Sequence, residues 1–418
     1  MIEAPRVRIR EERLKQLLEG INQFGRNPST GGFNRMGFSK ADMAARDWLA
    51  EVMAVEGLSV HRDAAANVFG RYGPPAGSCV MVGSHLDTVR EGGALDGALG
   101  VAAGLECVLA LRDAGISLDH PVEVVATSEE EGRFGGMLGS QAIVGDLDPQ
   151  WLQQATAADG LRLADAMRAQ GLDPSLLPTA QRAKGNIKAF LELHIEQGPI
   201  LEASGLSIGV ADRISGVVNW SVKLRGAANH SGTTPMNLRA DAFAGLAEVS
   251  VAIPKIIRRV GTEYSRVTIG KVDVEPNFPH TIPGTANFSL VIRDNHASAM
   301  DALCVALRDQ IHATCHAHGL TYTLIEHSRL PPVELDPALA QLLLEEARAL
   351  GVPHQVMPSG AGHDAQTMQA LCPAGLIFVP SRGGISHAPE EWTDWSDIYA
   401  GAQLLLNSVL RLAIPSRQ

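Results

Sequence analysis

The sequence contains few cysteines, no long apolar run and no excess of positive charge. Its 5 cysteines among 418 residues are odd in number, scattered and without a C-x-x-C spacing. This pattern is typical of reduced, mostly buried thiols in a cytosolic protein and argues against a disulfide framework. The first residues, MIEAPRVRIREERLKQ, contain no apolar signal-peptide core, and no segment reaches about 18 consecutive apolar residues. We therefore expect a cytoplasmic protein that is neither secreted nor membrane-spanning.

The formal net charge of −11 argues against nucleic acid or anionic lipid as a partner, because those surfaces select basic proteins. The composition, 45% hydrophobic and 19% charged, is typical of a soluble globular protein. The length of 418 residues exceeds what one ordinary core accommodates, so two domains are expected. The sequence shows no internal repeat and no low-complexity segment.

The first half of the sequence alternates helical and strand patterns. Apolar residues recur at helical spacing in 40–54, after Ser39 as a candidate N-cap, and 98–114 is small and apolar like a core helix. Buried strands are predicted within 79–88 and 121–132. The pattern predicts an α/β sheet, with its site beyond the carboxyl ends of the strands.

The pattern changes after about residue 211. Strands of alternating polarity are predicted at 219–226 and 285–294, with a third near 266–274 and helices near 240–259 and 297–318. From about residue 328 a helix, a buried strand at 375–381 and a closing helix at 396–413 restore the first pattern. We predict a discontinuous catalytic domain, 1–211 and 328–418, with an α+β domain inserted at 212–327.

The predicted strand ends carry candidate metal ligands. His85 follows one strand, and Asp87 is spaced to accept the second imidazole proton and so orient the ring. Asp96 lies in the glycine-rich segment GGALDG, where a backbone can approach an ion closely. A single H-x-D pair is weak evidence, since histidines near strand ends are often merely hydrogen-bonded.

Three adjacent carboxylates, Glu129 to Glu131, follow the second strand. Such a run is usually a solvated acidic loop. At the end of a buried strand, however, these charges need a cation, and one carboxylate could bind metal while its neighbour takes a proton from water.

Further histidines lie in short polar segments. His194 precedes Glu196 and Gln197 in LELHIEQGP, His387 lies in GISHAPEEWT, and His363 precedes Asp364 in SGAGHDA. Each alone could equally be a structural histidine. A fourth cluster, in DQIHATCHAHG (His312, Cys315, His316 and His318), has the pattern of a surface helix without a carboxylate in register, and we do not predict a metal site there.

Taken together, these segments resemble the hydantoinase/carbamoylase family of amidohydrolases. That family includes N-carbamoyl-L-amino-acid hydrolases, allantoate amidohydrolases and β-ureidopropionases, and it is related to the dinuclear zinc exopeptidases. The resemblance extends from about residue 10 to residue 413 and rests on GSHLDT, DGALGV, EEEGRF, LHIEQGP, NHSGTTPM, SGAGHDA and GISHAPEEW in the family's order. It implies a zinc-exopeptidase-like domain with a mixed, mostly parallel sheet, interrupted by a lid and dimerisation domain.

The resemblance also implies two divalent metal ions, zinc or else manganese, cobalt or nickel. It implies that Asp96 bridges the ions, that His85 and His194 complete one site, and that Glu131 and His387 complete the other. Glu130 would be the general base, and Asp87 would be a further catalytic residue. His230 would stabilise the oxyanion, typically across a homodimer interface.

Substrate-binding roles are implied for Gln197, Asn277, Arg293 and His363. Arg293 suits a carboxylate, because its guanidinium is planar and permanently charged. The sequence departs from the family at His280 and Thr281, where Asn and Val are common, and EEEGRF lacks a small residue before Arg133. These departures bear on substrate identity and on the role of Arg133.

The implied reaction is hydrolysis of the ureido C–N bond of an N-carbamoyl-L-amino acid or related ureido acid, releasing ammonia and carbon dioxide. Allantoate and ureidoglycolate are alternative substrates. More distant alternatives are a dipeptidase or aminoacylase of the same superfamily and a non-catalytic binding paralogue. LHIEQGP and Arg293 weigh against the former, and the complete ligand set with Glu130 weighs against the latter.

Overall fold

The computed structural model describes residues 7–414, which form two compact units. Unit 1 contains the chain up to Asp212, Leu335–Met357, and the chain from His363 onward. Unit 2 contains Arg213–Glu334 and Pro358–Gly362. Within the described residues, no helix is both long and apolar enough to cross a membrane.

A nine-stranded mixed sheet forms the framework of unit 1, with the order β1-β2-β4-β3-β5-β14-β6-β12 and β13 paired to β6. Its central strands β4, β3, β5 and β14 are parallel, whereas β1, β2, β6 and β12 pair antiparallel. The predicted α/β fold with a mixed sheet is confirmed. The strands are β1 (Ser59–Arg62), β2 (Val68–Tyr72), β3 (Cys79–His85), β4 (Val122–Thr127), β5 (Ile187–Ile195), β6 (Ile208–Ile214), β12 (Val333–Glu334), β13 (His354–Ser359) and β14 (Ala374–Val379).

The helices of unit 1 follow the predicted periodicity where a pattern was strong. Ser39 caps α2 by accepting a hydrogen bond from the Asp42 N–H, and α3 is buried on nearly all sides because its residues are small and apolar. The helices are α1 (Glu11–Ile21), α2 (Lys40–Val55), α3 (Ala98–Asp113), α4 (Leu138–Val144), α5 (Pro149–Gln154), α6 (Leu163–Ala169), α7 (Ile200–Ser204), α10 (Pro337–Leu350), α11 (Asp364–Met368) and α12 (Trp395–Ala413), with short 3-10 helices η1 (Pro174–Ala180) and η3 (Arg382–Gly384).

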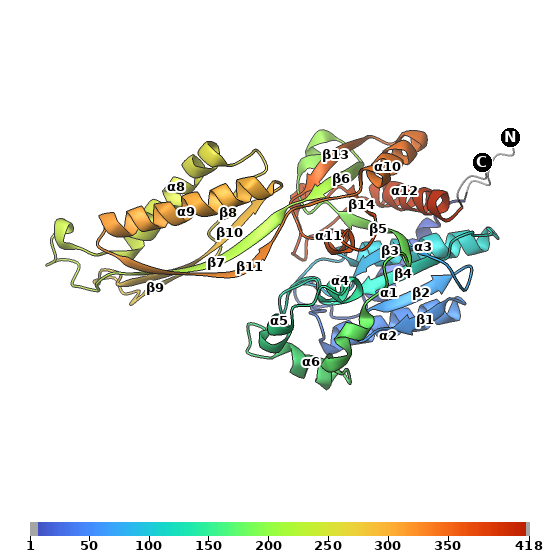
Figure 1. Cartoon of the computed structure of the whole chain (residues 1–418), viewed down its shortest axis with the longest axis horizontal. Helices are drawn as coiled ribbons and strands as arrows, with labels where there is room; N and C mark the ends of the chain where they lie inside the picture. Colours follow the sequence, from blue (N-terminus) through green and yellow to red (C-terminus); the bar gives the residue numbers. More distant parts are fainter. Residues whose placement is uncertain (1–6, 415–418) are drawn as a thin grey trace. The chain divides into compact units, whose positions relative to one another are not determined.

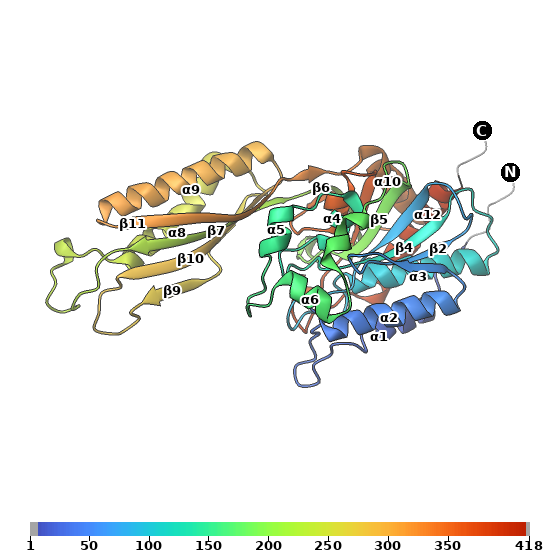
Figure 2. The ribbon, with the colours of Figure 1, turned by 60° about the horizontal axis from the view of Figure 1, so that its bottom comes forward.

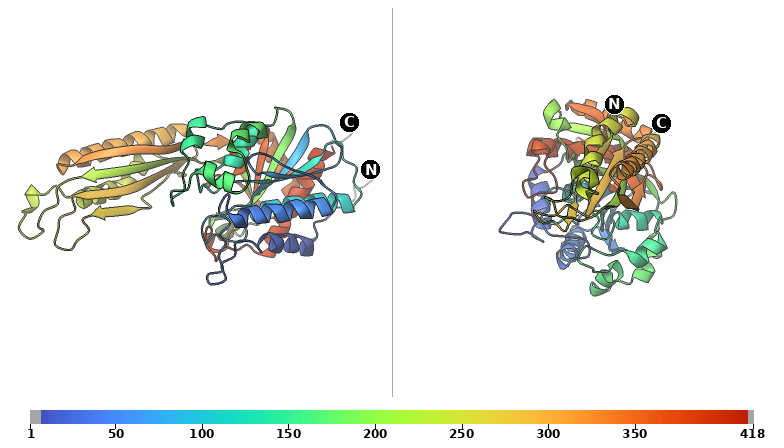
Figure 3. Two further views of the ribbon diagram at one scale, coloured as in Figure 1. Left: turned by 90° about the horizontal axis from the view of Figure 1, so that it is seen from below. Right: turned by 90° about the vertical axis from the view of Figure 1, so that its left-hand side faces the viewer.

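Among the described residues, two apolar cores stabilise unit 1, whose helices and strands are drawn in Figures 1 and 3. The larger one joins the central strands to α1, α3, α10 and α12 and to the apolar side of α2. The smaller one lies among α4, α6, η1 and the start of α2. All five cysteines are buried and unpaired, as expected for reduced thiols.

Unit 2 has a five-stranded antiparallel sheet of order β11-β7-β10-β8, with β9 paired to β10. Two helices, α8 and α9, cover one of its faces, as Figure 2 shows. Alternate residues of β7 and β10 point into this core, which explains their period-two pattern. The elements are β7 (Gly216–Arg225), β8 (Arg266–Thr268), β9 (Val272–Glu275), β10 (Thr285–Asp294), β11 (Thr321–Leu330), α8 (Ala242–Val260), α9 (Ala297–Ala317) and the 3-10 helix η2 (Met236–Leu238).

Two features of unit 2 differ from the sequence prediction. The single strand expected near 266–274 is two short strands, β8 and β9. Sequence inspection missed β11, which continues to Leu330 past the predicted boundary at 328. Most of its residues are exposed, so it lacks the apolar alternation that reveals β7 and β10.

Candidate metal centre and active site

The carboxyl ends of four parallel strands bring the predicted ligands together. His85 is the last residue of β3, His194 lies near the end of β5, and Glu131 follows β4. His387 lies in the segment between β14 and α12. Because parallel strands end at one edge of a sheet, ligands far apart in the sequence meet there.

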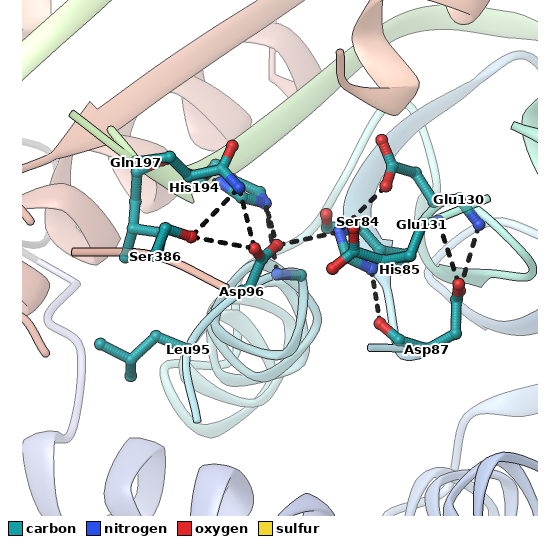
Figure 4. Close-up of polar contacts among 12 residues, drawn as sticks. Ser84, His85, Asp87, Leu95, Asp96, Glu130, Glu131, His194, Gln197 and Ser386 are labelled. Carbon is teal, nitrogen blue, oxygen red and sulfur yellow. Dashed lines mark hydrogen bonds and ion pairs between the residues drawn. The ribbon is translucent and has the colours of Figure 1, made fainter. Parts of the chain in front are cut away.

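Asp96 lies at the centre of this cluster. Its Oδ1 is 3.3 Å from His85 Nε2 and 3.1 Å from His194 Nε2. Its Oδ2 is 3.3 Å from His387 Nε2, which is also 3.4 Å from Glu131 Oε2. The side chains thus form two ligand groups, His85–Asp96–His194 and Asp96–Glu131–His387, that share one carboxylate. Figure 4 shows Asp96 between His194 and His85.

Two histidines have orientations that suit metal ligation. His85 Nδ1 is 2.9 Å from the Asp87 carbonyl oxygen, and His194 Nδ1 is 2.9 Å from the Ile195 carbonyl oxygen. Each carbonyl accepts a hydrogen bond from Nδ1–H, so the Nε2 atom of each ring faces Asp96 and can bind a metal ion there once it is unprotonated. His194 Nε2 also accepts a hydrogen bond from the Gly97 N–H at 3.2 Å, as an unprotonated nitrogen does.

Gly97 lets the Asp96 turn approach His85. Its φ is +64°, and a Cβ there would lie 2.5 Å from the imidazole ring of His85. A side chain at this position would therefore be strained by its backbone conformation and would also collide with a ligand. The glycine-rich segment predicted to let backbone approach an ion instead lets it approach a ligand ring.

The charges of the cluster fit divalent cations. Burial alone would raise the pKa of Asp96, but when His194, His387 and His85 are protonated at Nε2, their hydrogen bonds hold it well below its usual range. Burial and repulsion from Asp96 raise the pKa of Glu131 to about 8, and its buried Oε1 has no hydrogen-bond partner. A bound divalent cation would relieve the repulsion between these carboxylates, because metal takes the place of protons on carboxylates and imidazoles. Imidazole and carboxylate donors suit zinc, manganese, cobalt or nickel.

Asp87 contacts the site differently from the sequence prediction. Its main-chain carbonyl, not its carboxylate, faces His85 Nδ1. The carboxylate instead accepts the N–H groups of Glu130 at 3.2 Å and Glu131 at 3.1 Å, as Figure 4 shows. The buried chain turns after His85, so that the carboxylate of Asp87 reaches the loop after β4. Asp87 therefore holds the backbone of the acidic loop.

The three adjacent glutamates point to different places. Glu130 Oε2 is 3.6 Å from His85 Nε2, and burial, with the charges of Glu131 and Asp364, raises its pKa well above the usual range. A carboxylate with a raised pKa is a stronger base. Glu129 is fully buried and accepts the Phe134 N–H at 2.5 Å, so its side chain stabilises the loop itself.

Gln197 and His363, both predicted to bind substrate, lie within unit 1 beside the ligands. The amide Nε2 of Gln197 donates to Asp96 Oδ2 at 2.8 Å and to Ser386 Oγ at 3.2 Å. His363 is buried, with its ring centroid 4.6 Å from that of His194. Both side chains are therefore close enough to the metal ligands to contact a substrate bound there.

Glu192, which sequence inspection missed, completes a third buried group with His194 and His363. Its oxygens accept hydrogen bonds from Ser84 Oγ at 2.6 Å and from the Ala365 N–H at 2.9 Å. It therefore stabilises the strand ends behind the ligands. Ser386 and Glu391 were missed too, although both lie within four residues of His387 in the segment GISHAPEEW.

His230, Asn277 and Arg293 belong to unit 2. His230 is exposed and its Nδ1 accepts the Gly232 N–H at 3.0 Å, while Asn277 is exposed with a φ of +50°. Arg293, on β10, donates to the Gly360 carbonyl at 3.0 Å. The two departures lie beside His230, because the segment containing His280 and Thr281 pairs with the segment around it. Their roles in the reaction stay predictions.

The histidine cluster of α9 forms no metal group among the described residues. His318 Nε2 lies 2.7 Å from Glu248 Oε2 on α8, as in an ordinary surface ion pair.

The chain is similar to known proteins over nearly its whole length. Residues 81–411 match the model of "Peptidase family M20/M25/M40". The chain is 39% identical to an N-carbamoyl-L-amino acid amidohydrolase of Geobacillus stearothermophilus, over 97% of this chain and 99% of that protein. It is 34% identical to an allantoate amidohydrolase of Bacillus subtilis (strain 168), over 95% and 96%.

A solved structure, an amidase of the hydantoinase/carbamoylase family from Burkholderia multivorans, superposes with a TM-score of 0.88 at 32% identity, over 98% of this chain and 99% of that one. These similarities extend over nearly the whole chain, including both units. The chain therefore belongs to peptidase family M20/M25/M40, as a hydrolase of linear amides similar to the hydantoinase/carbamoylase amidases.

Proposed function

We propose that the protein hydrolyses the ureido C–N bond of an N-carbamoyl-L-amino acid or a closely related ureido acid. The observation that carries this proposal is the position of Asp96 between two ligand groups, with the carboxylate of Glu130 beside them. The names of the similar proteins support a ureido substrate. Allantoate and ureidoglycolate are the alternatives, since both carry a carboxylate and a ureido group.

Two divalent ions, held by His85, Asp96, Glu131, His194 and His387, would supply Lewis-acid polarisation of a carbonyl and lower the pKa of water. Glu130 would take the proton from the attacking water and return it to the leaving nitrogen. Water adds to the ureido carbon, the C–N bond breaks, and the products are the amino acid, ammonia and carbon dioxide. Asp87 would keep Glu130 and Glu131 in place through their N–H groups.

The experiment is ammonia release by metal-stripped protein after addition of Mn²⁺, Zn²⁺ or Co²⁺. The substrates are N-carbamoyl-L-amino acids, allantoate, ureidoglycolate, 3-ureidopropionate and a dipeptide. We expect turnover of at least one ureido acid only with metal, and a loss of about 10²–10⁴-fold in kcat for Glu130→Gln. Because Glu130 is not among the predicted ligands, this variant should still bind metal. Cleavage of the dipeptide alone would refute the proposal in favour of a peptidase.

We further propose that unit 2 acts as a lid and dimerisation domain, with Arg293 and Asn277 binding the substrate carboxylate and His230 stabilising the oxyanion of the partner subunit's substrate. A mixing experiment tests this, because in a mixed dimer the Glu130→Gln and His230→Ala changes would fall in the same active site and leave the other site intact. We expect the mixture to regain up to about a quarter of the activity. About half of the dimers would be mixed, and one of the two sites in each mixed dimer would be intact. Two inactive variants that stay inactive when mixed would contradict action across an interface.

A further inference from the structure

Three of the predicted ligands lie in loops rather than in strands: Glu131, whose N–H the Asp87 carboxylate accepts, and Asp96 and His387. Asp96 precedes α3, and His387 lies between η3 and α12 with a φ of +57°. His387 is also the most exposed ligand, with 48% of its side chain accessible, whereas those of His85 and His194 are almost fully buried. The loops of Asp96 and His387 therefore need another support.

Glu391 connects the two loops. Its Oε1 accepts the N–H groups of Leu95 and Asp96, each at 3.0 Å. Its Oε2 accepts the Ser386 hydroxyl at 2.9 Å and the His387 N–H at 3.3 Å. Glu391 is only 3% exposed. Its carboxylate therefore receives its hydrogen bonds from these four donors and not from water. Ser386 Oγ also lies 3.3 Å from Asp96 Oδ2, which closes the network around the shared ligand.

The chemistry of a carboxylate suits this position. Each oxygen of an ionised carboxylate can accept two hydrogen bonds and donates none, and here each faces two donors. A glutamine of the same shape would direct its NH₂ group at the donors of one loop, which would lose both bonds. The loop that faces the amide nitrogen would be repelled, while the other would keep its contacts.

We propose that Glu391 is a positioning residue for metal binding: by holding Asp96 and His387 together it sets the affinity for the ion bound by Asp96, Glu131 and His387. The inference rests on the metal centre of the proposed function. It concerns one ion more than the other, because Glu391 contacts neither His85 nor His194 among the described hydrogen bonds.

Gly93 offers an independent way to disturb the same contact. A Cβ on Gly93 would lie 2.1 Å from Glu391 Oε1 and 2.2 Å from its Cδ. Gly93 does not have a positive φ, so alanine there is strained only by this collision. Because the clash also includes the Cβ of Glu391, at 2.4 Å, Gly93→Ala should displace the whole Glu391 side chain from the N–H groups that its carboxylate accepts.

The neighbouring residue supplies a matched control. Glu390 is adjacent in the sequence and exposed, whereas Glu391 is buried. Glu390→Gln removes the same charge from the same loop without touching either ligand backbone. A difference between the two glutamine variants therefore reports the hydrogen bonds and not the charge.

The test is calorimetric titration of metal-stripped full-length protein with MnCl₂, comparing the unchanged protein, Glu391→Gln, Gly93→Ala and Glu390→Gln. We expect two binding steps, one of them weakened about 10–100-fold in Glu391→Gln and Gly93→Ala, with the other changed less. Glu390→Gln should bind like the unchanged protein. The double variant Gly93→Ala with Glu391→Gln should bind metal no more weakly than the weaker of the two single variants, because both substitutions disrupt the same contact.

Thermal unfolding of the metal-stripped variants separates positioning from a purely structural role. Unchanged metal affinity in both Glu391→Gln and Gly93→Ala would overturn the proposal, and so would equal weakening of both steps together with a lower unfolding temperature. The titration uses no substrate, so it tests metal binding independently of the reaction. A protein that binds two ions but hydrolyses no ureido acid would refute the proposed function, and the metal affinities of the variants would still decide this inference. An unchanged protein that binds no metal would refute both.

Discussion

Two buried carboxylates near the metal centre, those of Asp87 and Glu391, accept hydrogen bonds from the backbone of loops that carry ligands. Asp87 binds the loop of Glu130 and Glu131, and Glu391 binds the loops of Asp96 and His387. When the backbone N–H of a ligand residue is hydrogen-bonded, the position of its Cα is fixed. Only the side-chain torsions of that residue can then still vary. Asp87 and Glu391 thus position the metal ligands through hydrogen bonds to the backbone, and not only through the imidazole rings.

Asp87→Asn tests this role of Asp87. In this variant an NH₂ group replaces one carboxylate oxygen and faces the N–H of Glu130 or Glu131. That hydrogen bond is lost, and the two N–H donors repel each other. We expect kcat with the ureido substrate to fall about 10–100-fold, a usual effect for a group that supports ligands. The measurement is steady-state kinetics in saturating metal.

Asp119→Asn, at an exposed aspartate of unit 1, is the control and should leave kcat unchanged. If Asp87→Asn were as active as this control, the hydrogen bonds to Glu130 and Glu131 would have no part in the reaction.

The turns between strands contain further polar groups that are buried or partly buried. In the turn between β1 and β2, Asp63 Oδ1 accepts the N–H groups of Ala65 and Asn67, each at 2.9 Å, and Oδ2 accepts the Asn67 amide. The amide of Asn67 in turn donates to Gly139 and accepts the Ser128 N–H, which connects this turn to the loop after β4. Burial raises the pKa of Asp63 to about 6, although its hydrogen bonds oppose the shift.

This shift predicts a pH dependence of stability. The pKa of about 6 in the folded protein exceeds the value of about 3.9 expected when unfolded, so the folded state binds more protons between these values. The free energy of unfolding should therefore decrease as pH rises from about 4 to about 7, by about 2 kcal/mol from this group, and should not decrease further above that range.

Asp63→Asn isolates this contribution. The variant loses one hydrogen bond at every pH, so the comparison concerns slopes and not absolute stabilities. We expect urea unfolding to show a smaller pH slope between about pH 4 and 6 than in the unchanged protein. Equal slopes would mean that Asp63 keeps an ordinary pKa in the folded state.

At the level of the molecule, every predicted metal ligand belongs to unit 1. Ligands that bind only the folded state stabilise it by mass action. Metal at a free concentration of about 100 times its Kd should therefore add about 2.7 kcal/mol to the free energy of unfolding of this unit.

Differential scanning calorimetry with and without chelator measures this effect. We expect the transition of unit 1 to move to lower temperature with chelator and that of unit 2 to stay in place. The double variant His85→Ala with His194→Ala should lose most of the metal-dependent shift. The same shift in that variant would mean that the metal binds elsewhere.

Several parts of the fold could be predicted because their determinants are local. The small apolar residues of α3, the Ser39 cap of α2 and the alternation in β7 and β10 act over a few residues, and the structure agrees with each prediction. The exposed strand β11 gave no such pattern. It becomes a strand by pairing with β7, about a hundred residues earlier, and a contact over that distance leaves no local signal.

The sequence by itself determined which residues could bind metal, since His85, Asp96, Glu131, His194 and His387 were named from short segments in a recognisable order. Only the tertiary structure decided how these residues are arranged. The order of the parallel strands brings Asp96 between His85 and His387, about 300 residues apart in the chain. It also turns the carboxylate of Asp87 away from His85 and brings Glu391 behind two loops. Hydrogen bonds between distant segments depend on packing, and packing is a property of the whole fold.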